Sequence, residues 1–369
     1  MKFSIEKNQI FKSLSHVQGI VEKKNTLPIL SNILIEVKAN SLILSATDMD
    51  ISITAKLNCN IIEEGSITVS AHTFYDIIRK LPDSSDIEII SNDGKIISIR
   101  AGKSKFSLGC LPKEDFPVIQ IEDLSNEITI DSQKLLKLID KTRFAISNEE
   151  TRYFLNGIYF HKRKENNLSF LSIVATDGHR LAKFDSEDND KEIPGVIIPK
   201  KTVNELYKLL IDFSGSIKIN LNSNKIVFYI GENILISKLI DGSFPDYNRV
   251  IPKDNNNILK INRQTFSLAV DRVSTITNDK SPIIKFKLLK NIMNMSSVNT
   301  ESGTATEDIA TNYSGDPIDI GFNSKYILEM INNLEDDEII LNFKDSSSPV
   351  TAMEESNPYL IYVLMPMRV

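Results

Sequence analysis

The sequence predicts an α+β fold built from three tandem copies of one domain, because two patterns each recur three times along its 369 residues. In the first pattern, two alternating apolar residues precede mostly apolar residues at i, i+4 and i+7, the spacings of a strand followed by an amphipathic helix. Its copies are Phe3, Ile5, Ile10, Leu14 and Val17; Ile128, Ile130, Leu135, Ile139 and Thr142; and Leu259, Ile261, Phe266, Val270 and Val273. A strand is therefore expected to lead into a helix three times.

A second pattern places a strand end before another helix in each copy. Its members share one spacing: Val69, Phe74 and Leu81; Ile198, Val203 and Leu210; and Phe322, Ile327 and Leu334. Alternating residues follow each of these helices, at 86–100, 216–229 and 337–343. Such alternation is typical of strands, so hairpin strands are expected after each second helix.

Shorter repeats keep the same register. The tripeptide at 46–48 (ATD) recurs at 175–177, and the dipeptide at 116–117 (FP) recurs at 244–245. The period of about a third of the chain exceeds the roughly 20 to 50 residues of solenoid repeats and suits domains of roughly 100 to 200 residues. We therefore predict domains at 1–125, 126–253 and 254–369.

Composition is that of an ordinary globular protein, with 41% hydrophobic and 25% charged residues. No apolar run approaches the roughly 18 residues that span a membrane, and the first repeat begins at the N-terminus, so a cytoplasmic protein without a membrane partner is expected. Cys59 and Cys110 lie in no metal or disulfide pattern. Neither a metal nor a cofactor is expected.

The net charge of −6 argues against a conventional basic DNA-binding domain. Basic residues instead gather on the repeated helices and next to them, while acidic residues gather at 185–190 and 335–338. The basic residues include Lys12, Lys24, Arg79, Lys80, Lys137, Lys141, Lys200 and Lys201. On any one helix these lysines could simply solvate an outer face, but their recurrence on six helices favours a shared basic surface.

A catalytic site would have to lie at 177–180 (DGHR), where a carboxylate, a histidine and an arginine crowd together. Asp177 corresponds to Asp48 of the first copy, which indicates a residue of a repeated turn. The other histidines, His16, His72 and His161, have no partner at a useful spacing, and no nucleotide-binding, hydrolase or metal motif is present. We expect no enzyme; a hydrolase that uses Asp177 and His179 is the alternative.

Five segments carry a resemblance to a known family, and their order and spacing are more specific than any one of them. They are 26–30 (TLPIL), 152–157 (RYFLNG), 175–182 (ATDGHRLA), 241–247 (DGSFPDY) and 365–369 (MPMRV). Over essentially its whole length the chain resembles the bacterial sliding clamps, the beta subunits of DNA polymerase III. The resemblance implies three DNA-clamp domains per chain and a non-enzymatic processivity factor.

The resemblance further implies a head-to-tail homodimer closed into a six-domain ring, with helices lining a hole that encircles double-stranded DNA. Contacts to phosphate carry no base information, so basic helices at the channel wall would let such a ring slide. Lys24 in a loop, and Tyr153 and Phe154 beside the channel, are implied to contact DNA, the aromatic rings by stacking on bases of single strands.

A pocket for short hydrophobic peptides is implied as well. Its partners would be the DNA polymerase III alpha subunit, the clamp loader, other DNA polymerases, and mismatch-repair and ligase-type proteins. The implied pocket residues are Arg152, Leu155, Thr176, Gly178, His179, Arg180, Leu181, Pro245, Arg249, Val250, Val363, Met365 and Met367. His179 and Arg180 would frame the pocket rather than catalyse, and Pro349 would form part of its rim.

A head-to-tail ring joins two unlike surfaces of one chain. The resemblance implies an edge strand at 103–108 on one side and the region around 275–276 on the other. The implied interface residues are Lys103, Lys105, Phe106, Leu108, Thr275, Ile276 and Glu301. Two alternatives stay open: Phe106 and Leu108 could point into their own core, and the chain could be a monomeric three-domain scaffold that never encircles DNA.

Overall fold

The computed structural model describes residues 1–22, 27–121, 124, 126–188, 192–278 and 282–368. The chain divides into two compact units: unit 1 comprises Met1–Leu136 and Lys201–Leu239, and unit 2 comprises Lys137–Lys200 and Ile240–Val369. These units do not coincide with the three sequence repeats, because the middle repeat contributes strands to both.

Unit 1 contains one antiparallel sheet, in which thirteen strands of the described chain follow the order β10-β15-β16-β17-β4-β3-β2-β6-β9-β8-β7-β1-β5. The strands are β1 (Lys2–Glu6), β2 (Asn32–Lys38), β3 (Ser41–Thr47), β4 (Ile51–Leu57), β5 (Asn60–Glu63), β6 (Gly65–Ser70), β7 (Asp86–Ile90), β8 (Ile96–Ala101), β9 (Ser104–Leu111), β10 (Asn126–Asp131), β15 (Ser216–Leu221), β16 (Lys225–Ile230) and β17 (Asn233–Lys238). Antiparallel pairing of β17 with β4, with Leu235 opposite Ile53, joins strands of the first and second repeats in one sheet.

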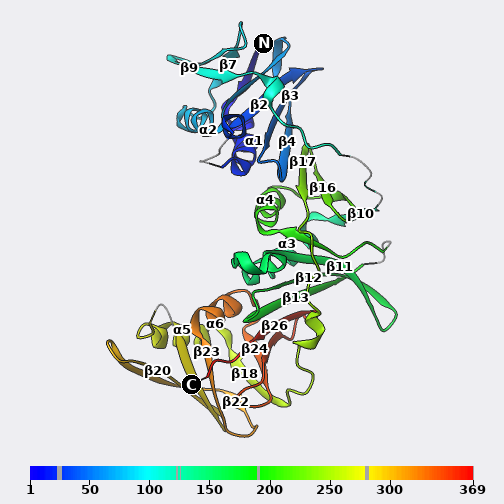
Figure 1. Ribbon diagram of the computed structural model, residues 1–369. Helices are drawn as coiled ribbons and strands as arrows, with labels where there is room; N and C mark the ends of the chain where they lie inside the picture. Colours follow the sequence, from blue (N-terminus) through cyan, green and yellow to red (C-terminus); the bar gives the residue numbers. More distant parts are fainter. Residues whose placement is uncertain (23–26, 122–123, 125, 189–191, 279–281, 369) are drawn as a thin grey trace. The chain divides into compact units, whose positions relative to one another are not determined.

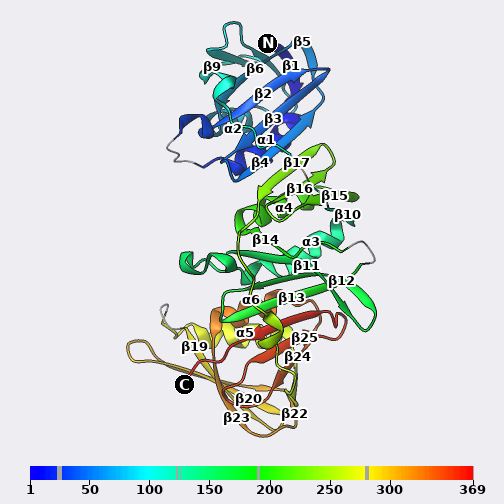
Figure 2. The ribbon, with the colours of Figure 1, turned by 45° about the vertical axis from the view of Figure 1, so that its right-hand side comes forward.

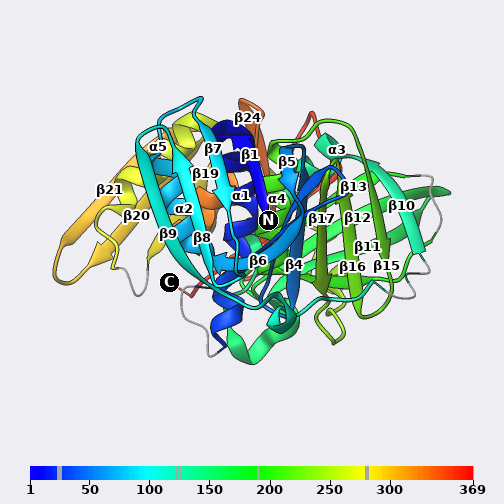
Figure 3. The same ribbon diagram turned by 90° about the horizontal axis from the view of Figure 1, so that it is seen from above.

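The helices of unit 1 confirm the expected strand-to-helix pattern. They are α1 (Lys7–Ile20), α2 (Ala71–Lys80) and α4 (Lys200–Ile211), of which α4 begins at the last residue of the first part of unit 2. Helix α1 packs on β3 and β4 and lies beside α2 (Figure 1; Figure 3). Leu14 and Phe74 are completely buried there. The apolar stripe read from the sequence is therefore the face that the helices bury.

Unit 2 contains two antiparallel sheets in the described chain, ordered β14-β11-β12-β13-β26-β25-β24-β18-β22 and β21-β20-β19-β23 (Figure 2). The larger sheet comprises β11 (Gly157–Glu165), β12 (Leu168–Thr176), β13 (Arg180–Glu187), β14 (Val196–Pro199), β18 (Asn257–Asn262), β22 (Asn312–Tyr313), β24 (Glu338–Phe343), β25 (Val350–Glu354) and β26 (Leu360–Leu364). The smaller one comprises β19 (Ile283–Leu289), β20 (Ile292–Asn299), β21 (Gly303–Ala310) and β23 (Ile318–Asn323). Pairing of β13 with β26 joins the second and third repeats.

Helices α5 (Arg263–Ser274) and α6 (Ser324–Asn332) of unit 2 pack against each other, as α1 and α2 do in unit 1. Helix α3 (Ser132–Asp140) crosses from one unit to the other along the chain. Side chains cap the N-terminal ends of α3, α5 and α6. Asp131 accepts the backbone N–H groups of Gln133 and Lys134, Asn262 accepts that of Thr265, and Asn323 accepts that of Lys325. No helix among the described residues combines the length and apolar character needed to cross a membrane.

Candidate functional site

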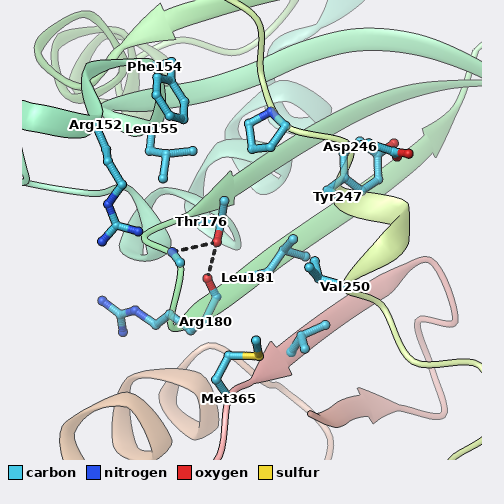
Figure 4. Close-up of a pocket in the computed structure, with 13 residues that line it drawn as sticks. Arg152, Phe154, Leu155, Thr176, Arg180, Leu181, Asp246, Tyr247, Val250 and Met365 are labelled. Carbon is cyan, nitrogen blue, oxygen red and sulfur yellow. Dashed lines mark hydrogen bonds between the residues drawn. The ribbon is translucent and has the colours of Figure 1, made fainter. Parts of the chain in front are cut away.

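A cavity of about 270 Å³, here called the apolar pocket, opens in unit 2 (Figure 4). The 3₁₀ segment Glu150–Leu155, the turn between β12 and β13, the segment 245–250 and the end of β26 surround it. Its lining residues are Arg152, Phe154, Leu155, Thr176, Gly178, Arg180, Leu181, Pro245, Asp246, Tyr247, Val250, Val363 and Met365. Ten of these belong to the pocket set implied by the sequence; Phe154, Asp246 and Tyr247 do not.

The apolar floor of this pocket is fixed by strand pairing. Leu181 of β13 lies directly opposite Val363 of β26, and both are buried in one cluster with Val174 and Tyr247. Nearer the surface, Val250 and Met365 keep 40% and 37% of their surface exposed. Exposed apolar side chains beside a formed apolar floor are typical of a surface that binds a partner.

The turn between β12 and β13 forms one wall. Oδ1 of Asp177 accepts hydrogen bonds from the backbone N–H groups of His179 and Arg180, at 2.9 and 3.0 Å. The hydroxyl of Thr176 accepts from the N–H of Gly178 and donates to the carbonyl of Arg180, as Figure 4 shows. Gly178 has a φ of +89°, and a Cβ atom there would overlap the guanidinium of Arg152. Glycine is therefore favoured at this position of the turn.

The same turn is present in unit 1. Oδ1 of Asp48 accepts from the N–H groups of Asp50 and Ile51, and the Thr47 hydroxyl bonds the N–H of Met49 and the carbonyl of Ile51. The interpretation of Asp177 as a residue of a repeated turn is thereby confirmed.

Arg180 is committed to the framework of the pocket. Its side chain is buried, and its guanidinium donates to the Asp177 carboxylate at 3.1 Å, to the carbonyl of Phe144 at 2.8 Å and to the Glu329 carboxylate. It also lies over the ring of Tyr326, 4.4 Å from the centroid. Arg180 thus ties the turn to α6, which carries both Glu329 and Tyr326.

Arg152 belongs to the 3₁₀ segment Glu150–Leu155, its guanidinium lies beside Gly178 of the same turn, and it is more accessible than Arg180. Its Nε and Nη2 atoms donate to the two carboxylate oxygens of Glu149, at 2.7 and 2.6 Å. These hydrogen bonds lower the pKa of the Glu149 carboxyl below its ordinary value. Glu149 therefore stays charged and holds the guanidinium at the pocket mouth.

A buried polar contact lies beneath the pocket. Nε2 of His161 is 2.9 Å from the hydroxyl of Tyr247, and the imidazole stacks on Tyr159 with 4.2 Å between ring centroids. Burial lowers the pKa of His161 to about 4 and raises that of Tyr247 to about 12, so both side chains are neutral near pH 7. Sequence reasoning treated His161 as an isolated histidine; the nearest signal was Tyr247 at the end of 241–247.

Three residues of the implied set lie outside the lining of the apolar pocket. His179 is exposed, and its carbonyl accepts from the N–H of Met365 at 2.9 Å. Met367 donates through its N–H to the carbonyl of Gly321 at 2.8 Å. Arg249 lines a second cavity together with Lys253, Lys344 and the expected rim residue Pro349. This cavity is here called the basic pocket.

The residues expected to contact DNA have different surroundings. Lys12, Arg79, Lys80 and Lys137 are exposed. Lys200 donates to the amide oxygen of Asn148, and Lys201 bonds Glu22 and Asp48. Tyr153 is 55% exposed, whereas Phe154 is half-buried and lines the apolar pocket. Lys24 lies outside the described residues.

Lys141 departs from its expected role. Only 5% of it is exposed, and its ammonium donates to the carbonyl of Asn333 at 2.8 Å and pairs with Glu335 at 2.6 Å. Its charge is satisfied within unit 2. Lys141 is therefore better understood as a structural residue than as a phosphate contact.

The residues expected at the dimer interface lie on or near two strands, β9 in unit 1 and β21 in unit 2. In unit 1, β9 pairs with β8 along 104–109 but with β6 only at Cys110 and Leu111, so 104–109 has no second strand partner among the described residues. Lys103 and Lys105 are exposed there, and Phe106 and Leu108 are half-buried. These apolar side chains are thus not fully inside their own core.

The second edge lies in unit 2. Strand β21 ends its sheet in the described chain, and Glu307 on it pairs with Arg272 of α5 at 2.5 Å. Thr275 caps α5 and is exposed, Ile276 is half-buried, and Glu301 lies exposed in the turn before β21. Sequence reasoning did not identify β21 as a strand, although its residues alternate between more and less exposed positions.

Comparisons with known proteins match one family along nearly the whole chain. Family models of the N-terminal, central and C-terminal domains of the DNA polymerase III beta subunit match residues 1–120, 129–246 and 248–368. The beta sliding clamp of Caulobacter vibrioides (strain NA1000 / CB15N) is 43% identical over 372 residues, and that of Escherichia coli K12 is 34% identical over 371 residues. Each alignment covers 100% of both chains.

The solved structures that resemble this chain are also sliding clamps. A DnaN sliding clamp from Bartonella birtlesii bound to griselimycin has a TM-score of 0.97 at 45% identity, and one from Pseudomonas aeruginosa bound to griselimycin has 0.94 at 34%. Both alignments cover 100% of each chain.

Proposed function

The chain belongs to the bacterial DNA polymerase III beta subunit family, and from this premise we propose which of its surfaces do the work of a beta sliding clamp. It is a processivity factor of DNA replication, which holds the polymerase on duplex DNA. The function requires three surfaces: one that closes a ring, one that faces DNA and one that binds partner proteins.

The ring is a head-to-tail homodimer in which each chain supplies three clamp domains, 1–125, 126–253 and 254–369. A head-to-tail contact joins unlike patches, and the chain offers two unlike sheet edges, at 104–109 of β9 and along β21. Pairing of one protomer's β9 with its partner's β21 would satisfy the backbone groups of both edges. Phe106 and Leu108 supply apolar contact, with Lys103, Lys105, Thr275, Ile276 and Glu301 around them.

DNA is held by encirclement and by contacts to phosphate. The exposed side chains of Lys12, Arg79, Lys80 and Lys137 support this role, because lysine and arginine bind phosphate without reading bases. The net charge of −6 over the whole chain disfavours DNA binding on the outside. Tyr153, exposed beside the pocket, is suited to stacking on a single-stranded base.

Partner proteins bind through a hydrophobic peptide in the apolar pocket. The observation that carries this proposal is the buried floor of Leu181 and Val363 beneath the half-exposed side chains of Val250 and Met365. Apolar anchors of a peptide would replace water over this floor, and methionine can adapt its shape to different anchors. The DNA polymerase III alpha subunit, the clamp loader and repair proteins would share the site.

The proposal is tested by titrating a peptide from the cognate polymerase alpha subunit into the Met365→Ala variant. Removing this partly exposed side chain is expected to raise Kd about 5- to 20-fold, equivalent to about 1–2 kcal/mol of lost apolar burial. Leu168→Ala is the matched control, since Leu168 is similarly exposed on β12 but outside the pocket. Griselimycin should displace the peptide. Unchanged binding in Met365→Ala, or equal losses in both variants, would contradict the proposal.

We also propose that the chain catalyses no reaction and acts in the cytoplasm, where bacterial chromosomes are replicated. The absence of catalysis is supported by the hydrogen bonds that Asp177 accepts within its turn and by the pairing of Arg180 with Glu329. Both side chains serve the framework of the site and neither is available as an acid or a base. A hydrolytic turnover that His179→Ala abolishes would reverse this conclusion.

A further inference from the structure

The basic pocket adjoins the apolar pocket in unit 2 and has a volume of about 350 Å³. Val250 and Met365 line both cavities. The far wall is fixed by Asn255, whose side-chain N–H₂ donates to the carbonyls of Asn342 and Pro349 at 2.8 and 2.9 Å. A peptide that fills the apolar pocket can therefore continue over Val250 or Met365 into a second formed cavity.

The charge of this second cavity is opposite to that of the chain as a whole. Arg249, Lys253 and Lys344 line it and are all exposed, and Asp254 is the one carboxylate among its lining residues. Arg249 is partly neutralised, since its Nε lies 3.0 Å from Asp246. Lys253 and Lys344 form no ion pair with any described residue. A locally positive cavity thus lies on a chain of net charge −6.

The nearby carboxylate of Asp345 does not neutralise Lys344. Its oxygens accept the backbone N–H groups of Ser347 and Ser348, at 2.8 and 2.7 Å, as well as both serine hydroxyls. These hydrogen bonds lower the pKa of Asp345 to about 2 and hold the carboxylate in its own turn. The two lysine ammonium groups remain the available partners for an incoming anion.

We propose that the basic pocket binds an acidic side chain of the partner peptide, adjacent in sequence to the apolar anchors that fill the apolar pocket. The inference rests on the proposed peptide-binding function and adds a rule of preference among partners. Apolar anchors provide most of the affinity, while an Asp or Glu that reaches Lys253 and Lys344 distinguishes one partner from another. Exposed ion pairs contribute modestly, which suits a site that ranks partners by charge.

The test uses synthetic peptides that share one aliphatic and aromatic anchor pair. One carries Asp in the N-terminal flank, one carries Asp in the C-terminal flank, and the reference carries Asn in both. With the full-length protein in calorimetry at low salt, one Asp peptide should bind about three- to fivefold more tightly than the reference. This advantage should shrink at high salt, because exposed charges are screened.

Lys253→Ala/Lys344→Ala should remove the advantage of the Asp peptide and leave the Kd of the Asn peptide unchanged. Lys287→Ala, an exposed lysine on β19 outside both pockets, is the control for loss of positive charge. Equal affinity of Asp and Asn peptides for the unaltered protein would overturn the inference, and so would equal losses in the Lys287→Ala control. Failure of every peptide, the Asn reference included, would instead contradict the peptide-binding function itself.

Discussion

The contact between His161 and Tyr247 links the buried interior of unit 2 to the wall of the apolar pocket. His161 is only 8% exposed, and its Nδ1 atom has no hydrogen-bond partner among the described residues. Nε2 is paired with the Tyr247 hydroxyl, so a neutral imidazole fits this site and a protonated one does not. Protonation of His161 would leave a second N–H group buried without an acceptor beneath Tyr247.

Because His161 is buried in its neutral form, the chain is expected to lose stability in mild acid. Burial lowers the pKa of His161 from its ordinary 6.5 to about 4 in the folded chain, so the unfolded chain binds more protons between these values. The stabilisation is present above pH 6.5 and is lost as the pH falls toward 4. We expect His161 to account for about 2 kcal/mol of the loss in unfolding free energy between pH 7 and 5.

Urea unfolding of the native chain and of His161→Gln at the two pH values measures this contribution. The variant should lose less stability than the native chain by that amount, since glutamine does not titrate. An equal pH dependence of the two proteins would show that His161 is not held neutral by the fold.

At the scale of elements, the turn at 47–51 in unit 1 shares its threonine and aspartate with the turn at 176–180 but differs at the residue that follows them. Met49, with a φ of +79°, stands where Gly178 stands in the second copy. A bulky residue is strained in this region of φ, so Met49→Gly should stabilise the chain by about 0.5–1 kcal/mol. Met49→Ala keeps the Cβ atom and should give no stabilisation. A higher melting temperature in Met49→Ala than in Met49→Gly would contradict this explanation.

The strands and helices of each repeat could be predicted from sequence because each depends on local apolar spacing. Ile10, Leu14 and Val17 form the buried stripe of α1, and Ile198 and Val203 mark the end of β14 and the start of α4. Pairings between repeats could not be predicted in this way. The pairings β17–β4 and β13–β26 join residues far apart in sequence. The division into two compact units therefore could not be predicted from local patterns.

In the candidate site, too, residues implied by local motifs could be predicted, whereas contacts between distant parts of the sequence could not. Leu181, Val363 and Met365 were implied by motifs and do line one pocket. The burial of Lys141 was missed because its partner, the carbonyl of Asn333, lies 192 residues away in sequence. Basic residues on an amphipathic helix look alike in sequence whether they face solvent or a distant acidic neighbour.

At the scale of the whole molecule, ring closure should depend on one sheet edge. Leu108→Lys places a charge on the β9 edge and is expected to raise the dimer Kd by at least about tenfold, through lost apolar burial and a charged edge. Ile62→Lys is the control, because Ile62 is exposed on β5, an end strand of the same sheet that lies outside the proposed interface. Sedimentation at micromolar concentration should show monomer in the first variant and dimer in the control. The opposite pattern would place the interface elsewhere.

The central claim is that the closed ring holds DNA by encircling it. The most direct measurement loads the protein with its cognate clamp loader onto nicked circular DNA, isolates the complex and linearises half of it. We expect the protein to remain on the circles and to leave the linear molecules, since a ring slides off a free end. Equal retention on both forms would contradict topological linkage and would require a conventional DNA-binding site.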